Sequence, residues 1–305
     1  MARNFPEVWV GRVENKLKTT DQAPWADGIS ELSSPVTTLG EGTDTEKNLI
    51  HIPTSDFEPT VLINNTTYPL ALEDYDDDTA VVALDKYQTL VTTVSDDDAM
   101  GASYDVVDNA TKGHVSSINS SKYMKAIHAI CPDQDSADTP VIKTSGVDDG
   151  NGRKVITRKD ITALKKKFDK MQCPKEGRRL VLCADHIADL LDNDQKFENQ
   201  YYAYKAGTIN DIFGFQVYEY IANPSYDGTT NKKLSWGAIP TDADFEVSVA
   251  FYAPNIAKKT GKTKQYFADS KTDPENQTNK LNYRHYFIML PKRKKYIGAI
   301  MSAKA

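Results

Sequence analysis

TRKDITALKKKFDKMQCPKEGRRLVLCADHIADLLDND, residues 157–194, carries the clearest local signals in the chain. Thr157 and Asp160 have the spacing of a capping box, which marks the first turn of a helix. Apolar residues then recur at steps of three and four: Ile161, Leu164, Phe168 and Met171. This period is typical of a helix with one buried face. The sequence therefore predicts an amphipathic helix that Pro174 and Gly177 bring to an end.

The second half of the same stretch predicts a strand and a short helix. RLVLC at 179–183 is apolar along most of its length, as in a buried strand. HIADLL, starting at His186, follows as a short helix for which Asp185 is the expected N-cap. The order helix, strand, helix within 38 residues indicates a mixed α+β fold.

AGTINDIFGFQVYEY, residues 206–220, predicts another strand. Aromatic and β-branched residues are dense after Gly214, and they alternate with more polar ones. Gly207 and Gly214 allow the chain to turn sharply into this strand. Tyr218 and Tyr220 fall on one of its faces, and we expect both rings to pack beneath the strand within one subunit.

The composition indicates a modest core. The 305 residues suggest about two domains by length. Only 39% are apolar, where a compact core normally draws on roughly 45–50%, and the mean hydropathy is -0.54. Arms and loops that complete their burial on neighbouring subunits would explain this balance, and so would solvated loops.

Charge and cysteine content argue against several classes of protein. A net charge of -6 disfavours a general nucleic-acid-coating role. Cys131, Cys173 and Cys183 are odd in number and lack CxxC or CxH spacing, which argues for reduced thiols and against a disulfide framework or zinc site. Residues 1–17 contain no apolar h-region of the kind found in signal peptides, and no apolar run approaches the ~18 residues of a membrane span. We expect an intracellular protein with no membrane partner.

The first third of the chain predicts extended structure. Residues 1–47 mix prolines and glycines with isolated apolar anchors and are expected to form an arm. Residues 48–70 alternate and are broken by Pro53 and Pro59, which predicts a long β-ribbon with its prolines at an edge. From about 97 to 130, apolar residues fall at helical steps and predict a long helix that Gly101 and Gly113 weaken.

The remaining segments are predicted from simpler patterns. Residues 132–156 are rich in Asp, Gly and Ser and predict either a surface loop or a small hairpin. FEVSVAFY at 245–252 alternates and predicts a strand. A basic, helix-like segment at 254–264 follows, and the last apolar-rich stretch begins at Asn282. There is no internal repeat.

Two motifs resemble ligand sites but have the wrong residue at positions that those sites require. GKT at 261–263 resembles the end of a phosphate-binding loop, but the position five residues before Gly261 is Ile256 where that loop needs glycine. DYDDDTAVVALD from Asp74 resembles a calcium loop, but its sixth residue is Thr79 instead of glycine and its twelfth is Asp85 instead of glutamate. A solvated acidic turn explains it better, and a weak adventitious divalent site stays open.

Two further groups of residues are candidates for catalysis or for binding. Cys183 and His186 lie three apart across a strand-to-helix turn, which suggests a nucleophile and base, but no oxyanion-forming glycine turn surrounds Cys183 and a buried structural cysteine is favoured. PKRKK at 291–295 could contact nucleic acid, end a strand in solvent, or pair with the acidic runs 73–78 and 96–98 of another subunit. We therefore expect no catalytic residues, no cofactor-binding residues and no metal ligands.

The order of these motifs resembles one family of structural proteins. Residues 157–194 resemble the peripheral-domain helix, the P-x-x-G-R-x-L-V-L strand and the short helix of tailed-bacteriophage major capsid proteins of the Hong Kong 97 type. AGTINDIFGFQVYEYIANP looks like the G-x-I-x-x-x-x-G-F-x-V-Y stretch of that family's axial domain, and VSVAFYAPNIAKKTG is similar to its returning strand and helix. The resemblance covers about half the chain, and the first half agrees only in layout.

The resemblance implies an α+β Hong Kong 97-like capsid fold and a division of the chain. The implied parts are an N-terminal arm (1–47), an extended β-ribbon loop with flanking strands (48–95), a peripheral domain with spine helix and polar insertion 132–156 (96–176), an axial domain (177–250) and a return to the peripheral domain (251–305). The polar insertion departs from the family pattern. No long coiled-coil scaffolding segment precedes the arm, so any scaffolding function is expected from a separate protein.

The resemblance also implies the function, which is that of a non-enzymatic major capsid protein. Hexamers and pentamers of the chain would form the icosahedral head of a phage or prophage, assembled in the bacterial host cytoplasm and present in the virion. Packaged double-stranded DNA, bound without sequence specificity, and scaffolding and portal proteins are the implied partners. An encapsulin-like nanocompartment shell is an alternative with the same fold. A soluble hydrolase whose site the sequence does not disclose is an alternative of another class.

Overall fold

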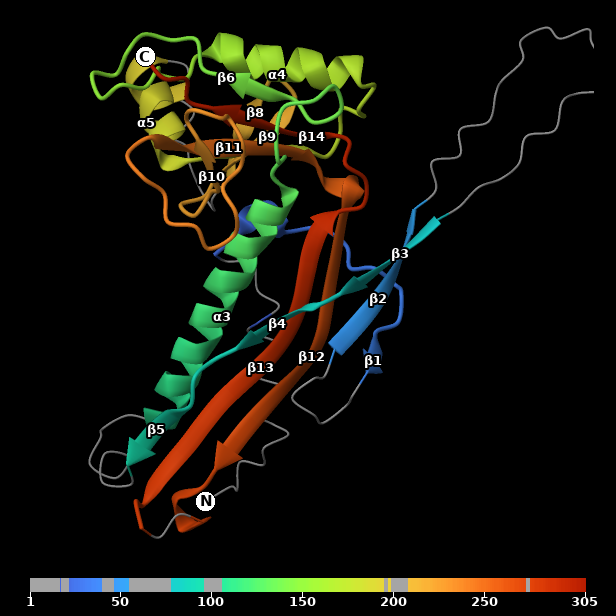
Figure 1. The fold of residues 1–305 in the computed structure, drawn as a ribbon, viewed down its shortest axis with the longest axis vertical. Coiled ribbons are helices and arrows are strands. Elements are labelled where there is room, and N and C mark those ends of the chain that lie inside the picture. The colour runs from blue at the N-terminus through green and yellow to red at the C-terminus, as the bar shows by residue number, and fades with distance from the viewer. Residues whose placement is uncertain are drawn as a thin grey trace, which may run out of the picture.

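The residues that the structure describes form three β-sheets, three α-helices and three short 3-10 turns (Figure 1). The computed structural model describes residue 17 and residues 22–39, 47–54, 78–95, 106–194, 197–198, 208–272 and 275–305. A seven-stranded sheet with two helices occupies one end of the molecule, and a long four-stranded sheet with one long helix extends from it. A three-stranded sheet projects from the side of the long sheet (Figure 1).

The seven-stranded sheet draws its strands from the middle and the end of the chain. In order across the sheet they are β6 (Val141–Lys143), β14 (Ile297–Met301), β11 (Asp244–Tyr252), β7 (Arg178–Leu182), β9 (Phe215–Glu219) and β8 (Thr208–Ile212), with β10 (Ser225–Asp227) paired to β11. β14 runs parallel to β6, and β7 runs parallel to β9. The strands predicted at 179–183 and 245–252 are confirmed as β7 and β11.

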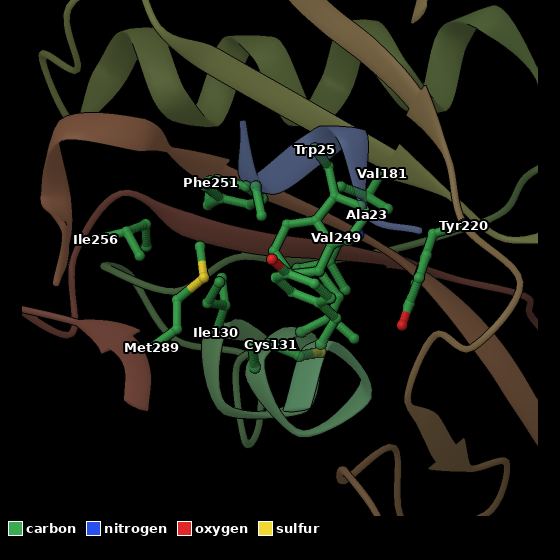
Figure 2. Close-up of a cluster of buried hydrophobic side chains, with 14 of the residues drawn as sticks. Ala23, Trp25, Ile130, Cys131, Val181, Tyr220, Val249, Phe251, Ile256 and Met289 are labelled. Atoms are coloured by element: carbon green, nitrogen blue, oxygen red, sulfur yellow. The ribbon is translucent and has the colours of Figure 1, made fainter. Parts of the chain in front are cut away.

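Apolar side chains alternate along the strands, so both faces of this sheet are apolar and covered by other elements. Leu180, Leu182, Phe215, Val217 and Ile300 point to the face covered by α4 (Arg158–Lys170) and α5 (Ala184–Asn193). Their neighbours Val181, Tyr218, Val249, Ala299 and Met301 point to the opposite face. There they meet the 3-10 turn η1 (Pro24–Ala26) and the end of the long helix (Figure 2). The side-chain period of two therefore builds two cores from one sheet.

α4 confirms the helix predicted after Thr157. The carboxylate of Asp160 accepts hydrogen bonds from the backbone N–H of Thr157 at 2.8 Å and from its hydroxyl at 2.9 Å. The helix ends at Lys170, earlier than Pro174, because Gln172 adopts the left-handed conformation with φ of 58°.

α5 confirms the short helix but not its predicted cap. Cys183 is the N-cap, and Asp185 lies inside the first turn. A carboxylate there is still favourable, because the helix dipole is positive at its N-terminal end.

The strand predicted after Gly214 is confirmed as β9, which forms a hairpin with β8. Phe213 and Gly214 have φ of 51° and 80°, as a two-residue hairpin turn requires. Gly207 lies outside the described residues. Tyr218 and Tyr220 are buried in the core opposite α4 and α5, as predicted, and the Tyr220 ring lies edge-on to Trp25 with centroids 5.7 Å apart.

The long sheet corrects one prediction. Its strands are β12 (Ile256–Ala268), β13 (Thr278–Pro291), β4 (Asp85–Gln88) and β5 (Thr92–Ser95). Residues 254–264 were expected to be helical, and they form the 3-10 turn η2 (Ala253–Asn255) and the start of β12 instead. β12 pairs with β13 along almost its full length, so distant strand pairing overrides the local preference of a lysine-rich segment. A further 3-10 turn, η3 (Ser270–Thr272), follows β12.

The long helix α3 (Val106–Ile130) lies along β13 and ends under the seven-stranded sheet. Its buried residues recur at steps of three and four: Thr111, His114, Val115, Ile118, Asn119, Lys122, Tyr123, Ala126, Ile127 and Ile130. The helix predicted at about 97–130 is therefore confirmed from Val106 onward, and residues 97–105 lie outside the described residues. No helix of the described residues is long and apolar enough to cross a membrane.

The three-stranded sheet contains the described part of the predicted ribbon. β1 (Thr37–Leu39), β2 (Lys47–Thr54) and β3 (Asp78–Ala83) pair antiparallel in that order. Pro53 lies beyond the residues of β2 that pair with β1, so it sits at an edge as predicted. Ile50 and Ile52 pack with Tyr286 and fix the base of this sheet to the long sheet. Pro59 and the rest of the predicted ribbon lie outside the described residues.

The polar segment 132–156 contains a small hairpin and one strand. Asp148 pairs antiparallel with Lys154, and Gly150 and Gly152 both have φ of 85° between them. Within the same segment, β6 joins the seven-stranded sheet beside β14. The hairpin alternative of the sequence analysis is therefore the observed one, and the segment is integrated into the sheet.

Candidate functional site

Cys183 and His186 belong to a closed polar cluster between β11 and α5. The His186 Nδ1 atom lies 2.6 Å from Ser248 Oγ, and its Nε2 atom lies 3.0 Å from Ser302 Oγ. Cys183 Sγ accepts a hydrogen bond from Ser248 Oγ at 3.6 Å. All four side chains are fully buried. The cluster ties α5 to β11 and to the residue after β14.

The electrostatics of this cluster are those of a protein interior. Burial raises the pKa of the Cys183 thiol to about 12, so the thiolate that a nucleophile needs is strongly disfavoured. Burial, with a smaller effect of Arg153, lowers the pKa of His186 to about 4. A substrate has no route to the buried thiol, so the arrangement serves packing and hydrogen bonding. The predicted structural role of Cys183 agrees with this geometry.

An ion-pair network that the sequence analysis missed joins the polar segment to α5. Both terminal nitrogens of Arg153 donate to the carboxylate of Asp189 at 2.7 Å, and its Nε lies 2.9 Å from Asp149. The backbone N–H of Ile156 donates to the same Asp189 carboxylate at 3.0 Å. Hydrogen bonding to Asp189 raises the pKa of Arg153. Because 36 residues separate the two partners, no local sequence pattern discloses the pair.

A buried lysine was also missed. Lys122 in α3 is only 2% exposed, and its ammonium lies over the rings of Tyr123 and Phe287, 4.8 and 5.1 Å from their centroids. It donates a hydrogen bond to the backbone carbonyl of Leu17. Burial, and then the positive charge of Lys258, lower the pKa of Lys122 to about 7. The local sequence SSKYMKAI does not predict that Lys122 is buried, because Lys125 in the same stretch lies near the surface and pairs with Asp85.

The two motif-like stretches do not form ligand sites among the described residues. Gly261 lies within β12, where a Cβ atom would stand 2.8 Å from the Tyr286 Cβ, so GKT is part of a strand and not a loop. Asp85 starts β4 and pairs with Lys125 at 2.7 Å. Residues 74–77 lie outside the described residues. No group of three or more metal-ligating side chains occurs in the part of the chain that the structure describes.

The basic run 292–295 forms the turn between β13 and β14. Asn255 Nδ2 donates to the backbone carbonyls of Arg293 and Lys295 at 3.0 and 2.8 Å, which fixes the turn. Lys294 is exposed, with its Nζ 4.0 Å from an Asp133 oxygen. This agrees with the strand-end alternative. The acidic runs proposed as its partners lie almost wholly outside the described residues, so that pairing stays a prediction.

Large apolar side chains stand exposed at several points of the described surface. The most exposed are Leu90 (91%), Ile239 (88%), Ile221 (79%) and Val147 (73%). Leu90 lies at the rim of an open groove of about 570 Å³ between the β4–β5 loop and α3. Ile221 and Ile239 lie on the loops that flank β10, near the half-exposed Trp236. Apolar side chains exposed singly in this way are normal on protein surfaces, and only a contiguous patch would mark an interface.

Comparison with solved structures identifies where this fold occurs. The capsid structure of the cyanophage P-SCSP1u is similar over 91% of this chain and 91% of its own, with a TM-score of 0.59 and 16% identity. The capsid of a native GTA particle matches over 94% of this chain and 91% of its own, with a TM-score of 0.63 and 7% identity. A chain of Mycobacterium phage Che8 matches over 90% of this chain and 97% of its own, with a TM-score of 0.55 and 16% identity.

These likenesses extend over nearly the whole length of each chain and are likenesses of fold. No protein-family model matches this chain, and no curated protein matches its sequence. The chain therefore has the mixed α/β fold of these capsid structures, with which it shares 7–16% sequence identity.

Proposed function

We propose that this chain is the major capsid protein of a tailed bacteriophage or prophage and builds an icosahedral head around double-stranded DNA. One observation carries the proposal, namely the similarity of fold to phage capsids along more than nine-tenths of the chain. The motifs at 157–194 and 206–220, which resemble those of the Hong Kong 97 type, support the same function independently of the fold.

The described elements can be assigned to the parts of such a subunit. We assign residues 1–47 to an N-terminal arm and 48–95 to the extended loop, whose base is the three-stranded sheet. α3 is the spine helix of a peripheral domain spanning 96–176, to which 251–305 return with the long sheet. Residues 177–250 form the axial domain. The seven-stranded sheet combines strands from these parts, since β14 pairs with β11 on one side and with β6 on the other.

The surface chemistry of the subunit suits repeated association. Exposed apolar side chains such as Leu90 and Ile239 lose their contact with water when neighbours cover them. Many modest contacts in closed symmetric rings sum to a stable shell, while each contact stays weak enough to be corrected. Hexamers and pentamers of this chain are therefore the expected partners, with scaffolding and portal proteins supplied separately.

The subunit acts as a structural protein in this proposal and not as an enzyme. The cysteine and histidine that sequence reasoning singled out are sealed in the interior, so we expect no catalytic, cofactor-binding or metal-ligating residues among them. Packaged DNA is bound without sequence specificity. The protein assembles in the bacterial host cytoplasm and resides in the virion.

Negative-stain electron microscopy of the purified full-length chain tests the proposal. We expect closed shells of uniform diameter, alone or after co-expression with the scaffolding protein encoded beside it. Discrete small oligomers under both conditions would contradict the capsid function. Shells that enclose one co-purified enzyme, with no portal or terminase genes beside the gene, would identify a nanocompartment instead.

A further inference from the structure

The N-terminal segment crosses the molecule as a strap, which we define as Leu17 together with residues 22–39. Leu17 is buried against α3, β5 and β13. Trp25 lies under the seven-stranded sheet, edge-on to Tyr123 and Phe251 with centroids 6.2 and 6.1 Å apart (Figure 2). Glu31 then pairs with Lys258 of β12. The strap thus contacts the long helix α3, the long sheet and the seven-stranded sheet.

Three basic side chains hold the strap by its backbone. Lys122 donates to the carbonyl of Leu17, and Lys259 donates to the carbonyl of Leu32 at 2.7 Å. Arg179 donates to the carbonyls of Trp25 and Asp27 at 2.7 and 2.6 Å. Of the three, only Lys122 is almost fully buried. An ammonium in an apolar interior is costly unless a carboxylate pairs with it, and no carboxylate of the described residues does so.

We propose that the protonation state of Lys122 controls how strongly the Leu17 end of the strap binds to the rest of the subunit. While the amine of Lys122 carries a proton, this end is bound weakly, and loss of the proton strengthens its binding. The geometry supports this because the seated Leu17 helps to close the pocket that excludes water from the amine. A neutral amine still donates one hydrogen bond to the Leu17 carbonyl, so deprotonation keeps the contact and removes the buried charge.

The groups around the amine set the direction of the effect. Lys258 of β12 adds positive charge, Glu31 of the strap adds negative charge at longer range, and His285 of β13 is a second buried base. Burial and the charge of Lys122 lower the pKa of His285 to about 3, so His285 stays neutral above neutral pH. Burial also lowers the pKa of Lys258 from its ordinary value. With Leu17 lifted out, the Lys122 pKa returns towards its ordinary 10.5.

The open strap therefore holds the proton over a pH range in which the seated strap has released it. Seating becomes about tenfold more favourable with each pH unit between about 7 and 10, and it is independent of pH from 7 down to the range where buried histidines protonate. This property belongs to the single subunit and does not depend on the proposed function.

Hydrogen exchange of the full-length chain, followed by mass spectrometry from pH 7 to 10 and corrected for intrinsic rates, tests the proposal. In the wild type we expect protection of peptides covering Leu17 and Gln22 to rise by roughly two to three orders of magnitude over this range. Lys122→Met should be strongly protected already at pH 7 and independent of pH. Lys125→Met, a matched change at a half-buried lysine of α3 that pairs with Asp85 and does not contact the strap, should show the wild-type dependence on pH.

Lys122→Arg provides the opposite variant, because guanidinium keeps its proton throughout this range. Its protection should stay low from pH 7 to 10, and it keeps the test decisive if the methionine variant fails to fold. Wild-type protection that does not change with pH would overturn the proposal. A Lys122→Met variant whose strap opens more readily than that of the wild type at pH 7 would also overturn it. In that case Lys122 would stabilise the bound strap through its hydrogen bond, and its charge would not weaken the binding.

Discussion

His186 and His285 show how single residues make the fold sensitive to acid. Both rings are fully buried, with hydroxyl partners instead of carboxylates: Ser248 and Ser302 for His186, and Thr263 for His285. Nothing in the sequence separates them from the exposed His51, because burial of a polar residue depends on which distant elements meet around it. Sequence reasoning placed Cys183 correctly as a buried residue because an apolar strand precedes it.

The first prediction is that subunit stability falls as pH drops from 6.5 to about 4. The folded-state pKa of His186 is about 4, below its ordinary 6.5, so the unfolded chain takes up the proton first and the stability present above pH 6.5 is lost. The loss from His186 alone is roughly 3 kcal/mol. Urea denaturation at pH 7, 5.5 and 4 measures it.

Two variants separate this effect from general acid denaturation. His186→Gln should be less stable at pH 7, because it cannot reach both serines, but should lose less stability between pH 6.5 and 4. His51→Gln, on the exposed side of β2, should keep the wild-type pH dependence. Equal slopes for all three proteins would rule out His186 as the source.

At the scale of the element, local signals predicted α4, β7, β9 and β11, and distant pairing decided β12. The capping box and helical spacing of α4 lie within 15 residues, so the sequence contains the whole signal. β12 has lysines and a glycine where a strand is not expected, and it exists because β13 runs beside it from Ile256 to Ala268. Gly261 is tolerated there because its missing side chain leaves room for Tyr286.

The second prediction compares the same substitution in two elements. Gly261→Ala should destabilise the subunit by about 1–3 kcal/mol, because the new methyl group meets Tyr286 and Leu84 within 3.0 Å. Gly113→Ala should instead stabilise it by up to about 1 kcal/mol, since that position is exposed on α3 and a Cβ meets nothing within 4 Å. Thermal unfolding of both variants measures the two signs, and a destabilised Gly113→Ala protein would show that the α3 groove is tighter than its geometry indicates.

For the whole molecule, the order of motifs predicted the class of fold that the capsid structures share. Individual contacts such as Arg153 with Asp189 or Lys122 with Leu17 could not be predicted, because their partners are 36 and 105 residues apart. The surfaces that would meet other copies are equally hidden in the sequence. An exposed isoleucine such as Ile239 looks the same there as the buried Ile300.

The third prediction concerns those surfaces. Ile239→Asp and Ile221→Asp should leave the subunit folded, because both side chains are exposed, and should block shell formation if neighbours cover them. Thr229→Asp, an exposed position in the same loop region, is the matched control and should assemble like the wild type. Circular dichroism checks the fold, and light scattering with electron microscopy measures assembly. Normal assembly of both isoleucine variants would remove these loops from the interface.

The position of β14 between β6 and β11 has a consequence for biosynthesis. Residues 297–301 supply an interior strand of the sheet, while the strands on either side of it are made about 45 and 155 residues earlier. On the ribosome, α4 is complete long before Ile300 and Gly298 arrive to form the floor against which Leu164 and Phe168 pack. Until then β6 and β11 each present an open edge to any other nascent chain. The subunit therefore cannot close this sheet before residues 297–301 have been made, so the period in which it can misassociate extends from the synthesis of β6 to that of β14.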